Sequence, residues 1–204
     1  MHISITENFY QPFLQLPKFS EKLDTRISNL RKKYHLDSLN TDEIRKEYFV
    51  EIFSWSVFTP DILDILKNYL NQFNIQRVID PCAGNAFHTY LIHNYLGIDV
   101  ITVDIQDEPA SWTPITEKDG RLALKELAPT EHLNSALLLS WIDYESLTIE
   151  LLELYQGKLV ISLGNYEGKS PQYLAKLKEK YNLQKQIVLQ MPWGLEEKIE
   201  IYSR

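Results

Sequence analysis

The sequence predicts a doubly wound α/β fold, in which a mostly parallel sheet lies between layers of helices. Short and continuously apolar runs begin at residue 77, and most of the segments between them can form helices. Continuous apolar character is typical of strands buried on both faces, as in a parallel sheet. Alternation of such strands with helices produces the doubly wound layer.

The predicted parallel strands are "RVIDPCA", "DVITVD", "SALLLSW" and "KLVISLGN". The C-terminal segment "KQIVLQMPWGLEEKIEIYSR" contains two further strands of alternating polarity, around 185–190 and 197–202. Too few residues separate these two strands for a crossover helix. We therefore expect them to pair as an antiparallel hairpin at the end of the sheet.

The first part of the chain has a helical pattern instead. The segment "FSEKLDTRISNLRKKYHL" carries apolar side chains at three- and four-residue spacing, at Phe19, Leu23, Ile27 and Leu30. A later helix is predicted to open with Thr59 as its cap and Pro60 at its first position. We expect an N-terminal helical cap over residues 1–70 and the α/β domain over residues 71–204.

Composition narrows the classes of partner. The 204 residues carry a net charge of −7, so no bulk positive field exists to bind long nucleic acid. The single cysteine, Cys82, cannot form an internal disulfide, which fits a reducing compartment. No signal peptide or apolar run of about 18 residues is evident, so we expect a cytoplasmic protein without membrane contact, with export by a signal-less route left open.

The turn "DPCAGNA" after the first predicted strand is the first candidate for a ligand site. In open α/β sheets, ligands bind beyond the carboxyl ends of the strands, near the point where the strand order reverses. Gly84 permits a positive φ or a close approach of the backbone, and Asp80 can accept a hydrogen bond from a cofactor amine. The alternative is that Asp80 only caps the turn and Gly84 only bends it.

A second acid favours the ligand site. Asp104 ends the strand "DVITVD", twenty positions after Gly84. An acid at about that distance accepts the ribose hydroxyls in Rossmann-like sites. The two strand ends together predict a nucleoside-binding site.

The order "VIDPCAGNA", "VITVDIQD", "ALLLSWIDY" and "PWGLEEKIEIYSR" resembles the motif series of class I S-adenosylmethionine-dependent methyltransferases. It looks closest to a poorly characterised methyltransferase-like group with "GAGxGYWA", "ALLLxWPPY" and a final "W…R". The resemblance covers about residues 50–204. It implies a Rossmann-like class I fold, with a mostly parallel seven-stranded sheet ending in the hairpin, and S-adenosyl-L-methionine as cofactor.

The resemblance also implies roles for particular residues. The methionine part of the cofactor would contact the first turn, at Asp80, Ala83, Gly84 and Asn85. Asp104 and Ile105 would hold the ribose and flank the adenine, and Asp119 would lie near the adenine amine. The segment "FSWSVFTPDIL" resembles "SWAIP" in the closer group, so Ser54 and Trp55 would cover the cofactor. Packing of Trp55 in the core is the alternative.

The segment "SWIDY" lies where amino-methyltransferases carry "[DNS]PP[YF]". By the resemblance, Ser140 belongs to the cofactor side of the site, and Ser140, Asp143 and Tyr144 keep the capacity to accept hydrogen bonds and to stack. Asp143 and Tyr144 are the catalytic candidates. A carboxylate beyond the fourth strand can hold a nucleophile near the methyl group and accept its proton. Alternatively, Asp143 is the N-cap of the helix that follows.

Two departures from the family pattern bear on cofactor binding. The three glycine positions of "GxGxG" are Cys82, Gly84 and Ala86 here. Cysteine and alanine preserve the approach of the backbone provided that neither position needs a positive φ. His88, in the first turn of the next helix, either faces the site or is a partly exposed helix residue. No histidine pair has the spacing of metal ligands, so no metal site is expected.

The sequence therefore predicts a methyltransferase that acts on an unidentified small molecule or protein. Two alternatives remain: a catalytically inactive domain that keeps the fold for partner binding, and an amino-methyltransferase acting on a nucleobase or nucleotide. A nicotinamide-dependent enzyme is disfavoured by the terminal hairpin. The sequence leaves the oligomeric state open.

Overall fold

The computed structural model describes residues 1–4, 50, 53–106, 111–142, 144–164, 171–191 and 196–204. The helix predicted around residues 19–30 lies outside these ranges. None of the helices in the described part of the chain has the length and apolar character needed to span a membrane.

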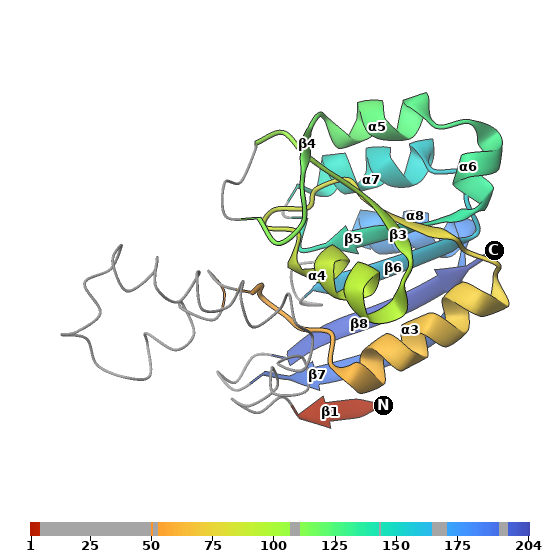
Figure 1. The fold of residues 1–204 in the computed structure, drawn as a ribbon. Coiled ribbons are helices and arrows are strands. Elements are labelled where there is room, and N and C mark those ends of the chain that lie inside the picture. The colour runs from red at the N-terminus through yellow and green to blue at the C-terminus, as the bar shows by residue number, and fades with distance from the viewer. Residues whose placement is uncertain (5–49, 51–52, 107–110, 143, 165–170, 192–195) are drawn as a thin grey trace.

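One eight-stranded sheet forms the centre of the fold (Figure 1). In chain order its strands are β1 (His2–Ser4), β2 (Arg77–Asp80), β3 (Asp99–Asp104), β4 (Thr116–Glu117), β5 (Ser135–Ser140), β6 (Leu159–Gly164), β7 (Asn182–Gln190) and β8 (Glu196–Ser203). Across the sheet their order is β1-β7-β8-β6-β5-β2-β3-β4. The α/β class is therefore confirmed. The eighth strand is the short β1, which pairs with β7 at the edge and which the sequence analysis placed within the helical cap.

The strands pair in the predicted parallel and antiparallel directions. Strands β2, β3, β4, β5 and β6 are parallel to their neighbours in this group. Strand β8 is antiparallel to both β6 and β7, so the predicted terminal hairpin is confirmed. The chain proceeds from β2 outward to β3 and β4 and then returns to β5 on the other side of β2. The strand order thus reverses between β2 and β5, where a ligand crevice is expected.

The helices in the described part of the chain are α3 (Pro60–Gln72), α4 (Phe87–Leu91), the π-helical turn η3 (Ile92–Leu96), α5 (Gly120–Glu126), α6 (Pro129–Leu133), α7 (Glu145–Leu154) and α8 (Pro171–Lys180). Thr59 caps α3 as predicted, because its side chain accepts a hydrogen bond from the N–H of Ile62. The proposed boundary at residue 70 falls inside α3, and the division into cap and domain stays a prediction.

Two apolar cores cover the two faces of the sheet. Helices α3 and α4 lie on one face, and α5 and α7 lie on the other (Figure 1). Successive strand residues alternate between them: Val78 belongs to the core under α3, whereas Ile79 belongs to the core under α7. Strands β5 and β6 are buried almost throughout. This double burial explains why their sequences are continuously apolar.

Tyr155, directly after α7, is expected to stabilise the pairing of β5 and β6. Its buried hydroxyl lies 2.5 Å from the carbonyl oxygen of Ser135 and 2.9 Å from that of Leu159, so its one hydrogen is shared between the two acceptors. We expect Tyr155→Phe to lower the free energy of unfolding by about 1–3 kcal/mol, because buried acceptors lose their donor. Urea unfolding measures this loss. The control is Tyr69→Phe, whose exposed hydroxyl lies 3.4 Å from the oxygen of Gln184 and should matter little; equal losses in the two variants would contradict the prediction.

Candidate functional site

Asp80 lies buried at the carboxyl end of β2. Its side chain is 2% exposed, and its Oδ1 atom has no hydrogen bond partner. Burial raises the pKa of Asp80 to about 7; the charge of Asp104 adds to this effect, and a hydrogen bond from the backbone of Cys82 opposes it. A buried carboxyl group with an unused acceptor atom suits a ligand that brings a donor or a positive charge.

The turn from β2 to α4 has left-handed backbone at two positions. Gly84 has a φ of +52° and Ala86 a φ of +58°. A Cβ atom on Gly84 would meet no atom within 4 Å, so this side of the turn faces open space. The N–H of Ala86 donates to the oxygen of Ala83 at 2.7 Å, and the N–H of Ala83 donates to the oxygen of Val103 at 3.0 Å. The turn is therefore closed on itself and tied to β3.

The φ of Ala86 decides whether alanine can replace the third glycine of the turn without strain. Alanine was acceptable at this glycine position provided that no positive φ was needed, and the structure shows that one is needed. Left-handed backbone costs a residue with a side chain about 1–2 kcal/mol. Cys82 has no positive φ, so only one of the two replaced glycines introduces strain.

Asp104 contacts the turn across the strand ends. Its Oδ2 accepts a hydrogen bond from the N–H of Gly84 at 2.9 Å, and its Oδ1 accepts one from the N–H of Gln106 at 3.3 Å. Each carboxylate oxygen has a second lone pair, so Asp104 keeps capacity for a ligand. Ile105, which follows, is 67% exposed. The structure therefore brings the predicted residues Asp80, Gly84 and Asp104 together at one edge of the sheet.

Asn85 holds the turn against the segment before α3. Its Nδ2 donates to the oxygen of Phe53 at 2.7 Å, and its Oδ1 accepts from the N–H of Phe87 at 3.1 Å. Its own carbonyl oxygen accepts from the N–H of Trp112 at 2.8 Å. The side chain of Asn85 thus has internal partners, and its predicted contact with a cofactor stays a prediction.

His88 is the centre of a second polar group, although it was not among the site residues predicted from the sequence. The ring is 6% exposed, so the alternative of a partly exposed histidine is wrong. Its Nε2 lies 2.9 Å from the oxygen of Ser56 and 3.2 Å from Oγ of Ser54, and its Nδ1 lies 3.2 Å from Oγ of Ser140. Burial lowers the pKa of His88 to about 4, despite the Ser56 contact. The only signal in the sequence is its place in the first turn after the glycine loop.

Two tryptophans lie beside this group. The rings of Trp55 and Trp141 have centroids 5.3 Å apart and an interplanar angle of 32°. Trp141 follows β5 with a φ of +50°, and its Nε1 donates to Oγ of Ser56 at 3.4 Å. Trp55 is 41% exposed, which contradicts the alternative that it packs in the core. The predicted residues Ser54, Trp55 and Ser140 are thus gathered around His88 and Trp141.

The catalytic candidates are only partly described. Asp143 lies outside the residues that the structure describes. Tyr144 is 73% exposed and occupies the N-cap position of α7, so this position does not belong to Asp143. The side chain of Tyr144 makes no capping hydrogen bond. Its predicted role in catalysis stays a prediction.

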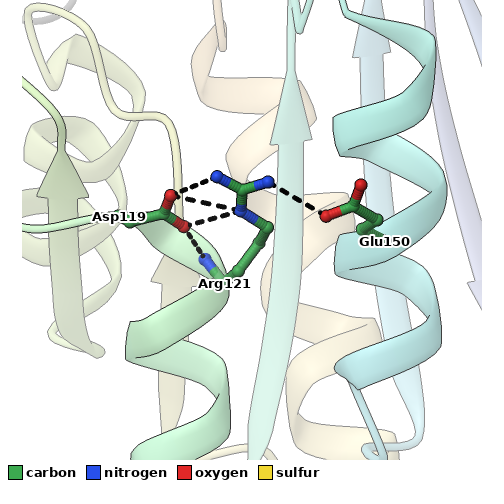
Figure 2. A network of polar contacts seen from close by, with 3 residues as sticks. All are labelled: Asp119, Arg121 and Glu150. Atoms are coloured by element: carbon green, nitrogen blue, oxygen red, sulfur yellow. Dashed lines mark hydrogen bonds and ion pairs between the residues drawn. The ribbon is translucent and has the colours of Figure 1, made fainter.

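Asp119 caps α5 and pairs with Arg121 (Figure 2). Its carboxylate accepts from the backbone N–H of Arg121 at 2.8 Å and from the guanidinium Nε at 2.9 Å, and Nη1 of Arg121 donates to Glu150 at 3.1 Å. The hydrogen bond from Arg121 lowers the pKa of Asp119 to about 2. These contacts join α5 to α7 and give Asp119 a structural role; its contact with the adenine amine stays a prediction.

The described residues contain no group of three or more His, Cys, Asp or Glu side chains that could hold a metal ion.

The carboxyl ends of β2 and β3 have the features that S-adenosylmethionine would need. These are an unpartnered buried carboxyl group, an open turn at Gly84, and a partly exposed acid at the end of β3. These residues fit the cofactor that the resemblance implies.

Comparisons with known proteins agree on the fold. No family model and no curated protein matches the sequence. Among solved structures, magnesium protoporphyrin IX methyltransferase from Synechocystis PCC 6803 with bound SAM is 10% identical, with a TM-score of 0.54 over 98% of both chains. The 1,6-didemethyltoxoflavin-N1-methyltransferase of Burkholderia thailandensis, with bound 1,6-didemethyltoxoflavin and S-adenosylhomocysteine, is 14% identical, with a TM-score of 0.51 over 93% of this chain and 90% of that one.

A third structure, TrmN from Thermus thermophilus, is 17% identical with a TM-score of 0.47 over 72% of this chain. The match spans 49% of that protein, about half its length. The likeness to the first two structures shows that this chain has the class I methyltransferase fold.

The buried ring of His88 is expected to make the protein less stable in acid. In the unfolded chain His88 takes up a proton near pH 6.5, whereas in the folded protein it stays neutral down to about pH 4. Between these values the unfolded state binds more protons, so the free energy of unfolding falls as the pH falls. From pH 7 to pH 5, wild type should lose about 2 kcal/mol relative to His88→Leu in urea unfolding.

Asp80 has the opposite effect on how the free energy of unfolding changes with pH. Its pKa is raised from 3.8 to about 7, so the folded protein binds the extra proton in this range and stability falls as the pH rises. Because wild type and His88→Leu both contain Asp80, its contribution cancels when their free energies of unfolding are compared. Leu91→Ala, in the same helix, loses buried apolar contact without a titrating group and should keep the pH dependence of wild type. The prediction would be contradicted if His88→Leu kept the same pH dependence of stability as wild type.

Proposed function

We propose that the protein transfers a methyl group from S-adenosylmethionine to a small molecule or a protein side chain. One observation carries this proposal: the buried Asp80 with its unpartnered Oδ1, the open turn at Gly84, and Asp104 lie together beyond β2 and β3. In sheets of this class, that edge is where ligands bind. The class I methyltransferase fold supports the choice of cofactor.

In this proposal each acid has a separate partner on the cofactor. Asp80 accepts a hydrogen bond from the methionine amine, and its burial favours a cation that restores its ionised form. Asp104 binds the ribose hydroxyls while it keeps its hydrogen bond from Gly84. Ile105 flanks the adenine, and the backbone of Ala83 and Asn85 completes the turn around the methionine part.

When bound, the cofactor supplies a methyl group on a sulfonium centre. The part of the protein is to hold the acceptor atom close to that methyl group and in line with its bond to sulfur. Ser140 ends β5, and Trp141, which lies against Trp55, follows it. The proposal assigns these residues to the acceptor side of the site, whereas the resemblance implied the cofactor side for Ser140. Asp143 and Tyr144 are the proposed residues for proton acceptance and for contact with the acceptor.

The second candidate function is a non-catalytic domain that keeps the fold for partner binding. The left-handed backbone of Ala86 favours it, because a strained turn is less suited to close contact with a cofactor than a glycine turn. An amino-methyltransferase acting on a nucleobase remains a narrower form of the first proposal.

Calorimetric titration with S-adenosylhomocysteine separates the two candidates. We expect binding, and we expect Asp104→Ala to weaken it on the order of a hundredfold, since two hydrogen bonds to a charged carboxylate are lost. Asp99→Ala is the matched control, because Asp99 is an exposed acid at the opposite end of β3. No binding at about millimolar ligand by a folded sample would refute the enzyme, and equal affinities of the two variants would refute the ribose contact.

The pH dependence of the same titration tests Asp80. A cationic amine binds best to the ionised carboxylate, and the pKa of Asp80 in the free protein is about 7. Affinity for S-adenosylhomocysteine should therefore rise about tenfold from pH 5.5 to pH 7, a range in which the amine stays cationic. Asp80→Asn should bind more weakly and with almost no change over this range. A pH dependence that persists in Asp80→Asn would rule out the assigned contact.

A further inference from the structure

The partners of His88 determine which of its ring nitrogens carries the proton. The carbonyl oxygen of Ser56, 2.9 Å from Nε2, can only accept a hydrogen bond. The hydroxyl of Ser54 donates to the same carbonyl oxygen, so toward Nε2 its oxygen acts as an acceptor as well. Both neighbours of Nε2 are therefore acceptors. In the neutral ring, Nε2 carries the hydrogen and Nδ1 is left with a lone pair.

This tautomer fixes the direction of the hydrogen bond to Ser140. Oγ of Ser140 lies 3.2 Å from Nδ1, and a nitrogen without hydrogen can only accept. The hydrogen of the Ser140 hydroxyl must therefore point at His88. Because a hydroxyl has one hydrogen, the oxygen of Ser140 has only lone pairs for any further partner. Ser140 is the last residue of β5 and is partly exposed.

We propose that His88 is a positioning residue that makes the Ser140 hydroxyl a hydrogen bond acceptor toward the methyl acceptor. The substrate group that meets Ser140 is then one that donates a hydrogen bond, an amine N–H or a hydroxyl O–H. This inference rests on the proposed methyltransferase function and specifies its substrate class. Methyl transfer forms the bond from that nitrogen or oxygen to carbon and breaks the carbon–sulfur bond, whose electron pair stays on sulfur. The displaced proton passes to the proton acceptor of the proposed function and from there to water.

The surroundings of His88 keep its ring neutral, with the hydrogen on Nε2. The ring is buried between Phe58, at a centroid distance of 4.7 Å, and the segment of Ser54 and Ser56. Burial lowers the pKa of His88, so the ring stays neutral at physiological pH and Nδ1 remains an acceptor. A protonated ring would donate from both nitrogens and would turn the Ser140 hydrogen toward the site.

The tautomer is measured directly by NMR of the ¹⁵N-labelled full chain. The ring-nitrogen shifts of the five histidines distinguish protonated from unprotonated nitrogens, and the signals missing in His88→Asn assign those of His88. We expect a protonated Nε2, an unprotonated Nδ1, and an Nδ1 signal that moves in Ser140→Ala. A protonated Nδ1, or one that Ser140→Ala leaves unchanged, overturns the inference.

Turnover tests the substrate class. The acceptors are pairs that differ only in the hydrogen on nitrogen: aniline with N,N-dimethylaniline, and benzylamine with N,N-dimethylbenzylamine. Formation of S-adenosylhomocysteine from S-adenosylmethionine is followed for each. We expect reaction only with the members that carry N–H, and reaction of a dimethylated member at a comparable rate overturns the inference. If neither pair reacts, the NMR result still decides the tautomer of His88 and with it the role of His88 toward Ser140.

Variants separate positioning from folding. His88→Leu should lower kcat/KM at least tenfold, and His88→Asn, whose Oδ1 can replace Nδ1 as acceptor, should restore most of it. Ser140→Ala should match His88→Leu, and the double variant should be no worse than either, because both remove one interaction. Leu91→Val, in the same helix, is the control for a small loss of core packing. Additive losses, or equal activities of His88→Leu and His88→Asn, overturn the inference.

Different results would refute the proposed function and the role of His88. Wild type that binds no S-adenosylhomocysteine in calorimetry refutes the methyltransferase, whereas the NMR result on His88 and Ser140 is obtained without cofactor. Wild type that binds the cofactor but has Nδ1 protonated refutes only the role of His88.

Discussion

The hydrogen bond from the backbone of Gly84 to the carboxylate of Asp104 joins the two strand ends on which the candidate site depends. It connects the turn after β2 to the end of β3. With that turn fixed, Asp80 stays buried beside it, and Ala86 holds the left-handed backbone from which α4 begins. Helix α4 in turn carries His88 toward β5. The contact of 2.9 Å between Gly84 and Asp104 thus lies at the start of a chain of elements that leads through α4 to His88 and β5.

The two sides of the site use polar groups in different ways. On the proposed cofactor side, Asp80 has an acceptor atom without a partner, and its raised pKa reflects the energy of keeping a charge there. On the proposed acceptor side, both ring nitrogens of His88 have partners, and burial keeps the histidine neutral. In the proposed function, the unsatisfied acid receives a cation, and Ser140, whose hydrogen is accepted by His88, receives a hydrogen bond donor.

Much of the fold could be predicted because double burial leaves a clear pattern in the sequence. The runs that became β5 and β6 are continuously apolar, and the alternating C-terminal runs became the antiparallel β7 and β8. Short strands escaped prediction: β1 has three residues and β4 has two, too few for any period to be visible. Asp104 was predicted from its spacing to Gly84, since the length of one βαβ unit fixes that spacing.

The sequence by itself determined the class of fold, the turn after β2 and the acid at the end of β3, because these follow from local pattern and from spacing along the chain. Only the tertiary structure decided that Ala86 adopts a positive φ, that Asp119 is held by Arg121, and that His88 lies between Ser56 and Ser140. The physical reason is distance in sequence. Ser56 and Ser140 are 32 and 52 positions from His88, and no local pattern records a hydrogen bond that packing of the sheet brings about.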